Sequence, residues 1–89
     1  MKTTFDAIEK RYDVKFPTHD GEVYCVAEDA FEYYYGTKGQ YGGPWVTIKK
    51  NTNGKWYYER LNKVSESEQF DEIQECIDAA YRDMSYSKY

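Results

Sequence analysis

The run over residues 45–61 limits the possible folds more than any other part of the chain. It contains two β-prone segments joined through Asn53-Gly54, the strongest short-range signal for a β-hairpin. A two-residue loop would mix polar and apolar side chains on both faces of this hairpin. A three-residue loop with a left-handed Gly54 puts Ile48 opposite Tyr58 and collects the apolar side chains on one face, which fixes the register. The other predicted pairs are Lys50 with Trp56 and Trp45 with Leu61.

The predicted register gives the hairpin two unlike faces. One face is expected to be buried, and it carries Val46, Ile48, Trp56 and Tyr58. The opposite face is more polar, and it carries Thr47, Lys49, Tyr57 and Glu59. Because an apolar face must pack against another layer of structure, the rest of the chain has to cover the first of these faces.

A helix is predicted near the amino terminus. Thr3 or Thr4 can cap it, and its apolar residues Phe5, Ile8 and Tyr12 recur at helical spacing. One apolar stripe of this helix should therefore face the sheet.

The clearest helical pattern lies beyond the hairpin. A capping box formed by Ser65 and Glu68 predicts where this long helix begins. Its apolar positions recur over four turns and should face inward: Phe70, Ile73, Cys76, Ile77, Ala80, Tyr81 and Met84.

Two segments between the first helix and the hairpin differ in clarity. Residues 22–27 predict a strand, and because they are apolar on both faces they are a candidate for the central strand. Residues 28–35 fit both a helical and a strand period, and we favour a short helix that ends at Gly36. Residues 36–44 predict a glycine-rich connector without the Gly-Lys-Ser/Thr of a phosphate-binding loop.

Together these elements predict an α+β fold in one domain of residues 1–89. The fold has an N-terminal helix, an antiparallel sheet of three or more strands that includes the 45–61 hairpin, and a long C-terminal helix packed on one face. The expected core comprises Phe5, Ile8, Val23, Cys25, Val46, Ile48, Trp56, Tyr58, Phe70, Ile73, Ile77 and Tyr81.

Composition narrows the class of protein. A chain of 89 residues holds one modest core, which favours a binding surface over an enclosed catalytic chamber. No apolar run is long enough to span a membrane, and the first residues lead into a charged helix, so we expect a cytoplasmic protein with no membrane partner. Cys25 and Cys76 show no metal-binding spacing, and we expect neither a cofactor nor a metal.

The net charge of −4 conceals a strong segregation of charge along the chain. Residues 38–63 carry six bases and one acid, whereas residues 64–84 carry one base and seven acids. The hairpin is therefore basic and the helix after it is acidic. These segments can neutralise one another on a solvated surface, or either one can serve as a binding surface.

A short resemblance to a known family lies at the end of the first helix. The run from Ile8 to Pro17 resembles the opening of the SUKH immunity domains, in which a helix also leads into an apolar-x-apolar-Pro segment. That family continues into another helix, whereas this chain turns at His19-Asp20-Gly21 and starts a strand. Neither the fold nor the sites of that family are therefore carried over.

Enzymatic chemistry has little support in the sequence, and we expect a protein that is not an enzyme. His19 is the only histidine, and a dyad with Cys25 would place the thiol in the middle of an apolar strand, where a thiolate is disfavoured. The carboxylates of the last helix lie on an exposed convex face, whereas acid/base pairs need burial to separate their pKa values.

The first functional hypothesis is a protein-binding module, an inhibitor or an adaptor. Its partner would be a protein with a basic surface, such as an enzyme that handles nucleic acid. In size and composition the chain resembles small acidic phage-encoded inhibitors of the anti-CRISPR or anti-defence type, which would act in the host cytoplasm. The candidate contact residues are Glu68, Asp71, Glu72, Glu75, Asp78, Tyr33, Tyr34 and Tyr35.

The alternative hypothesis is a nucleic-acid-binding hairpin. A β-ribbon can enter a major groove and aromatic rings can stack on bases, and a helix-packed hairpin is similar to the arm-binding domains of phage integrases. The candidate residues are Lys49, Lys50, Lys55, Tyr57 and Arg60. Against this hypothesis, the acidic helix would repel phosphates.

Overall fold

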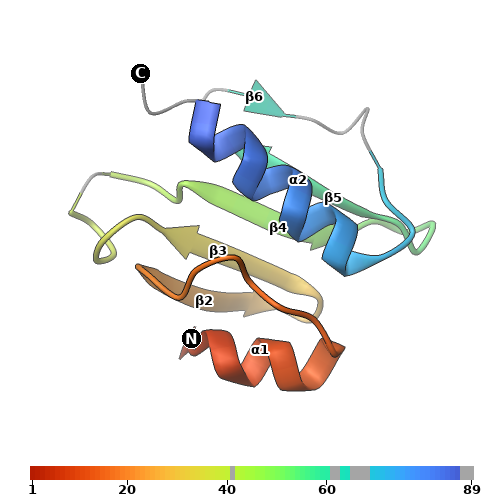
Figure 1. The fold of residues 1–89 in the computed structure, drawn as a ribbon, viewed down its shortest axis with the longest axis horizontal. Helices are drawn as coiled ribbons and strands as arrows, with labels where there is room; N and C mark the ends of the chain where they lie inside the picture. Colours follow the sequence, from red (N-terminus) through yellow and green to blue (C-terminus); the bar gives the residue numbers. More distant parts are fainter. Residues whose placement is uncertain (41, 61–62, 65–68, 87–89) are drawn as a thin grey trace.

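The computed structural model of the chain is an antiparallel sheet with two helices packed on one of its faces (Figure 1). It describes residues 1–40, 42–60, 63–64 and 69–86. The elements follow one another as β1 (Lys2–Thr3), α1 (Phe5–Tyr12), β2 (Glu22–Ala27), β3 (Ala30–Tyr34), β4 (Val46–Lys50), β5 (Trp56–Arg60), β6 (Lys63–Val64) and α2 (Ile73–Tyr86). The predicted α+β class and the packing of the C-terminal helix on the sheet are confirmed.

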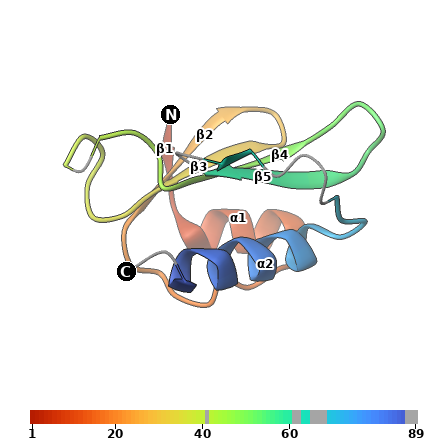
Figure 2. The same cartoon turned by 90° about the horizontal axis from the view of Figure 1, so that it is seen from above.

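The strands lie in the sheet in the same order as in the chain, from β1 to β6, and every neighbouring pair is antiparallel. Figure 2 shows α1 and α2 on the same side of the sheet, and in Figure 1 the segment that follows α1 runs between them. We call the side with the helices the covered face and the opposite side the open face. In the described part of the chain, no helix is long and apolar enough to cross a membrane.

The hairpin of β4 and β5 has the predicted register. Ile48 pairs with Tyr58. The three-residue loop is closed by a hydrogen bond of 2.8 Å from the Asn51 N–H to the Lys55 carbonyl, and Gly54 has a φ of +80°. Lys50 also pairs with Trp56 as predicted, whereas the pair of Trp45 with Leu61 lies outside the described residues.

The core lies between the covered face and the helices. Phe16 comes from the segment that follows α1, and its ring packs 5.1 Å from the ring of Phe5 and 6.0 Å from that of Tyr81. This segment therefore adds a ring that touches α1 and α2. Two residues of the predicted core, Cys25 and Phe70, are only partly buried at its margin. The predicted core residues that are buried are Phe5, Ile8, Val23, Val46, Ile48, Trp56, Tyr58, Ile73, Ile77 and Tyr81.

The first helix begins at one of the two predicted caps. The hydroxyl of Thr4 accepts a hydrogen bond of 3.0 Å from the Ala7 N–H, which satisfies one of the free donors of the first turn. The helix ends where Asp13 adopts a left-handed conformation with a φ of +55°. Thr4 rather than Thr3 is the cap, because Thr3 belongs to β1 and pairs with Val23.

The short helix favoured for residues 28–35 is wrong, because this segment contains strand β3. Phe31 and Tyr33 are buried on the covered face, and Ala30 and Tyr34 are buried on the other side. Burial on both faces puts apolar residues next to one another in sequence, and this pattern imitates a helical period. The middle positions of the sheet belong to β3 and β4, so the candidate central strand at residues 22–27 is in fact the second strand of the sheet.

The last helix begins at Ile73, whereas the predicted apolar stripe began at Phe70. Phe70 is extended, because its N–H and its carbonyl each form a hydrogen bond of 2.8 Å with the backbone of Trp56. This bridge excludes Phe70 from the helix, which comprises the 14 residues of α2. The predicted capping box of Ser65 and Glu68 lies outside the described residues.

Candidate functional site

The predicted acidic contact residues that the structure describes lie together at the start of α2. Asp71 and Glu72 precede the helix, Glu75 lies in its first turn and Asp78 follows one turn later. All four are exposed, and we call them the acidic surface. The spacing of three residues from Glu75 to Asp78 keeps these two side chains on one side of the helix, and Glu72 lies just before its first residue. Glu68 lies outside the described residues.

The carboxylates of the acidic surface differ in their partners. Asp71 forms an ion pair with Lys55 of the hairpin, and Asp78 accepts a hydrogen bond of 3.1 Å from the Gln74 amide. The side chains of Glu72 and Glu75 have no hydrogen-bond or ion-pair partner among the residues that the structure describes. Their negative charge is therefore available to a partner.

The acidic surface rests on a fixed support. The Gln74 amide oxygen accepts a hydrogen bond of 2.8 Å from the Lys15 N–H, and its amide nitrogen donates one of 2.8 Å to the Lys15 carbonyl. On the inner side of the helix, Cys76 and Ile77 are fully buried. The acidic side chains thus project from a helix that is held both to the core and to the segment after α1.

The three tyrosines expected at the contact surface do not share one environment. Tyr33 is buried on the covered face, where burial raises its pKa. Tyr34 is buried on the open face, where burial and a hydrogen bond of 2.7 Å to Glu32 raise its pKa to about 12. Tyr35 is half-exposed beside Trp45. Tyr33 and Tyr34 are therefore buried within the protein's own structure, and Tyr35 is the exposed one of the three.

The basic residues of the hairpin point in different directions. On the open face, Lys49 forms an ion pair of 3.1 Å with Glu59, opposite the half-buried Tyr57. Lys50 lies 5.6 Å from the centre of the Trp56 ring.

The other two bases of the hairpin are turned toward the last part of the chain. Lys55 reaches Asp71, and Arg60 donates a hydrogen bond of 3.4 Å to the Asp83 carbonyl of α2. The bases of the hairpin therefore do not form one continuous basic ribbon of the kind that follows a line of phosphates. Their charges are divided between two faces. Lys49 and Lys55 pair with acids, Lys50 lies over a ring, and Arg60 bonds to a carbonyl.

The only histidine lies among carboxylates rather than beside a thiol. His19 Nε2 is 2.9 Å from Glu9 Oε2, and His19 Nδ1 is 3.8 Å from Asp6 Oδ1. The Cys25 thiol instead donates a weak hydrogen bond to the Ala27 carbonyl. No interaction between His19 and Cys25 is found in the described part of the chain, so the geometry gives no support to the dyad considered from the sequence.

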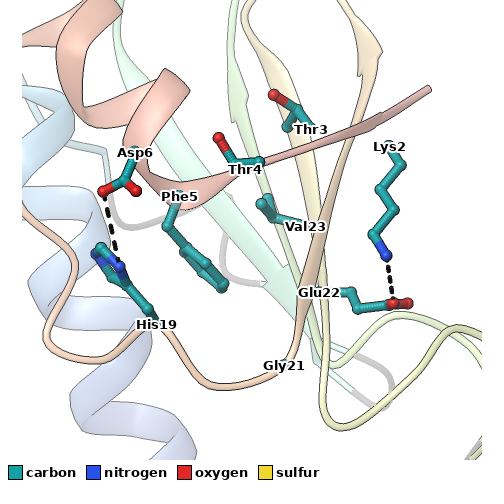
Figure 3. A pocket seen from close by; sticks show the side chains of 9 residues that line it. All are labelled: Lys2, Thr3, Thr4, Phe5, Asp6, His19, Gly21, Glu22 and Val23. Atoms are coloured by element: carbon teal, nitrogen blue, oxygen red, sulfur yellow. Dashed lines mark hydrogen bonds and ion pairs between the residues drawn. The ribbon is translucent and has the colours of Figure 1, made fainter.

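A cleft of about 280 Å³ lies beside this histidine, between β1, the first turn of α1 and the start of β2 (Figure 3). The group of Asp6, Glu9 and His19 is not predicted from the sequence. His19 comes to lie beside α1 only because the chain turns back toward this helix after Pro17. The spacing of Asp6 and Glu9 on one helix was the only available signal. The cleft is lined by Lys2, Thr3, Thr4, Phe5, Asp6, His19, Gly21, Glu22 and Val23.

Comparisons with known proteins add no functional information. The chain matches no protein-family model, no curated protein and no solved structure. Function must therefore be inferred from the positions and charges of this chain's own residues.

Proposed function

We propose that this protein is a non-enzymatic protein-binding module, an inhibitor or an adaptor, that docks through its acidic surface on a basic surface of another protein. The observation that carries this proposal is the state of Glu72 and Glu75, which are exposed and lack partners among the described residues. Exposed charges of one sign attract a complementary surface, accelerate encounter and select the partner.

The arrangement of the opposite charges supports protein binding over nucleic-acid binding. A nucleic-acid site needs cations that follow a line of phosphates and are free to replace counterions. Here Lys49 is engaged by Glu59 and Lys55 by Asp71. The net charge of −4 adds long-range repulsion of phosphates.

The partner chemistry follows from the contact surface. Carboxylates on one side of a helix fit a groove or ridge that presents Lys or Arg, as proteins that handle nucleic acid do. An inhibitor of the phage anti-defence or anti-CRISPR type is the form of this proposal that the size and composition favour. Half-exposed Tyr35 is an additional aromatic contact residue in the proposal.

The proposal is tested by capturing the partner and then measuring binding to the purified partner. The tagged protein is used in a pull-down from its native host, and a double variant, Glu72→Lys with Glu75→Lys, is compared with it. Both side chains are exposed, so the variant should fold, which circular dichroism verifies. We expect at least a tenfold loss of affinity for the purified partner, and an affinity of the unaltered protein that falls with added salt.

The matched control is Lys49→Glu with Lys50→Glu, which changes the same number of charges with the opposite sign. Its binding to the purified partner should change much less than that of the acidic-surface variant. Equal binding by the unaltered protein and the Glu72 and Glu75 variant would refute the proposal. A gel shift with nucleic acid that disappears in the lysine variant would favour the nucleic-acid hypothesis instead.

A further inference from the structure

Three potential metal ligands converge between α1 and the segment that follows it. Asp6 and Glu9 lie three residues apart on α1, and His19 returns to the same side of that helix. One ligand atom from each of the three residues lies within 4.8 Å of the other two. Ligands of one zinc ion, each about 2.0–2.2 Å from the metal, lie closer together than this limit, so side-chain rotation must bring the three groups together.

Two of the three ligands are already held in place by other parts of the chain. The His19 ring stacks on the ring of Phe5, with 5.2 Å between centres and 10° between planes, and Phe5 itself is buried. The carboxylate of Glu9 accepts a hydrogen bond of 2.8 Å from the Phe16 N–H. Such outer contacts orient ligands and reduce the ordering that metal binding would otherwise require.

The two carboxylates lie beside different nitrogens of the imidazole. Glu9 Oε2 is 2.9 Å from Nε2, and Asp6 Oδ1 is 3.8 Å from Nδ1. A metal ion bound at Nε2 would meet Glu9 directly, and the exposed Asp6 side chain would have to rotate toward it.

We propose that Asp6, Glu9 and His19 form a binding site for a divalent transition-metal cation, with Zn²⁺ as the best match. An imidazole nitrogen suits Zn²⁺, whereas Mg²⁺ and Ca²⁺ prefer oxygen ligands alone. Three protein ligands leave one position of a tetrahedral zinc ion free. Both Asp6 and His19 line the cleft of about 280 Å³, which has room for water or a small ligand at that position (Figure 3). The site does not depend on the acidic surface of α2.

The first test is calorimetric titration of the protein with zinc chloride near neutral pH. We expect one ion per chain, and an affinity that falls at least tenfold in His19→Gln and in Asp6→Asn. The matched control is Asp13→Asn, which removes an exposed carboxylate outside the cluster and keeps a side chain that tolerates the left-handed conformation of this residue. The Cys25→Ser variant should bind zinc like the unaltered protein.

The second test does not depend on any variant. Because the chain has one histidine, its imidazole NMR signals report on His19 without ambiguity, and zinc should shift them in proportion to occupancy. The proposal is overturned if no saturable binding is found, if His19→Gln binds as tightly as the unaltered protein, or if zinc binding is lost in Cys25→Ser. Zinc binding that leaves the imidazole signals unchanged would also overturn it.

Discussion

The two faces of the sheet are built from alternate residues of the same strands, yet they are stabilised in different ways. On the covered face, apolar side chains such as Val23, Ile48 and Trp56 are buried beneath the helices. On the open face, tyrosines and charges pair with one another: Tyr34 donates a hydrogen bond to Glu32 within β3, and Lys49 forms an ion pair with Glu59 between β4 and β5. Burial dominates the first face and polar pairing the second.

This difference implies that the cost of a substitution depends on whether its side chain points to one face or to the other. Burying an aliphatic side chain contributes about 1.5–3 kcal/mol, whereas an exposed ion pair contributes about 0–1 kcal/mol. Neighbouring positions of one strand should therefore differ severalfold in their effect on stability.

The largest expected effect lies beneath the covered face. Ile77→Ala should lower the free energy of unfolding by about 2–5 kcal/mol, because Ile77 is fully buried and its truncation leaves a cavity. The comparison variant is Val26→Ala, at a side chain that is 48% exposed where the register of β2 shifts, and it should cost less than about 0.5 kcal/mol. Chemical denaturation measures both, and similar midpoints for the two variants would contradict the contrast.

The next effect concerns two glycines with similar backbone angles and different surroundings. Gly21 has a φ of +93°, and a Cβ there would lie 2.4 Å from the Tyr34 carbonyl oxygen and 3.0 Å from the Tyr33 ring. Gly54 has a φ of +80° at the hairpin tip, with open space around it. Gly54→Ala should cost about 1–2 kcal/mol from backbone strain alone, and Gly21→Ala should cost more. Thermal unfolding of the two variants measures both costs. If Gly54→Ala proved more destabilising than Gly21→Ala, the packing around β3 would have to be loose.

The stability of the protein at alkaline pH should show whether the Tyr34 phenol on the open face is shielded from water. Burial and the hydrogen bond to Glu32 raise the pKa of Tyr34 to about 12, from an ordinary value of 10.0. The folded protein thus favours the neutral phenol, and the unfolded chain releases its proton first as the pH rises. The stabilising contribution of Tyr34 is fully present below pH 10.0 and is lost as the pH rises through about 12.

Tyr34→Phe provides the comparison for this prediction. Its stability, measured by denaturation at several pH values, should fall less steeply over this alkaline range than that of the unaltered protein. Identical slopes would mean that the Tyr34 phenol is accessible to water in the folded protein.

The smallest expected effect lies at the exposed pair of Lys49 and Glu59. Their side chains are 39% and 27% exposed, and a double-mutant cycle with alanine at both positions should give a coupling energy of about 0–1 kcal/mol. The coupling should weaken as salt is added. A coupling as large as the cost of Ile77→Ala would show that the two faces do not differ in the way described.

The sequence predicted those parts of the fold whose signals are local. The register of the hairpin follows from the turn at Asn53-Gly54 and from the alternation around Ile48 and Tyr58. The helix α1 follows from its cap at Thr4 and from the helical spacing of its apolar residues. In each case a few neighbouring residues contain both the stop signal and the periodicity.

The missed features depend on contacts between distant segments. β3 is buried on both faces, with Tyr33 packed against Phe5 of α1 and Tyr81 of α2, and Phe70 is extended because its backbone bonds to that of Trp56. The group of Asp6, Glu9 and His19 depends on a turn whose course no local pattern specifies. The acidic segment could be read from charge alone, whereas the separation of the basic residues onto two faces required the structure.

The strand order also has a consequence for how quickly the molecule can reach its native state. Each strand from β2 to β5 bonds to the next strand in the chain, so most of the ladder closes loops of modest length. Low average sequence separation between contacting residues is associated with rapid folding, because little chain entropy is lost before contacts form. We expect the sheet to grow outward from the turn at Asn51–Lys55, with α2 docking last, and to do so faster than a sheet of equal size with crossed connections.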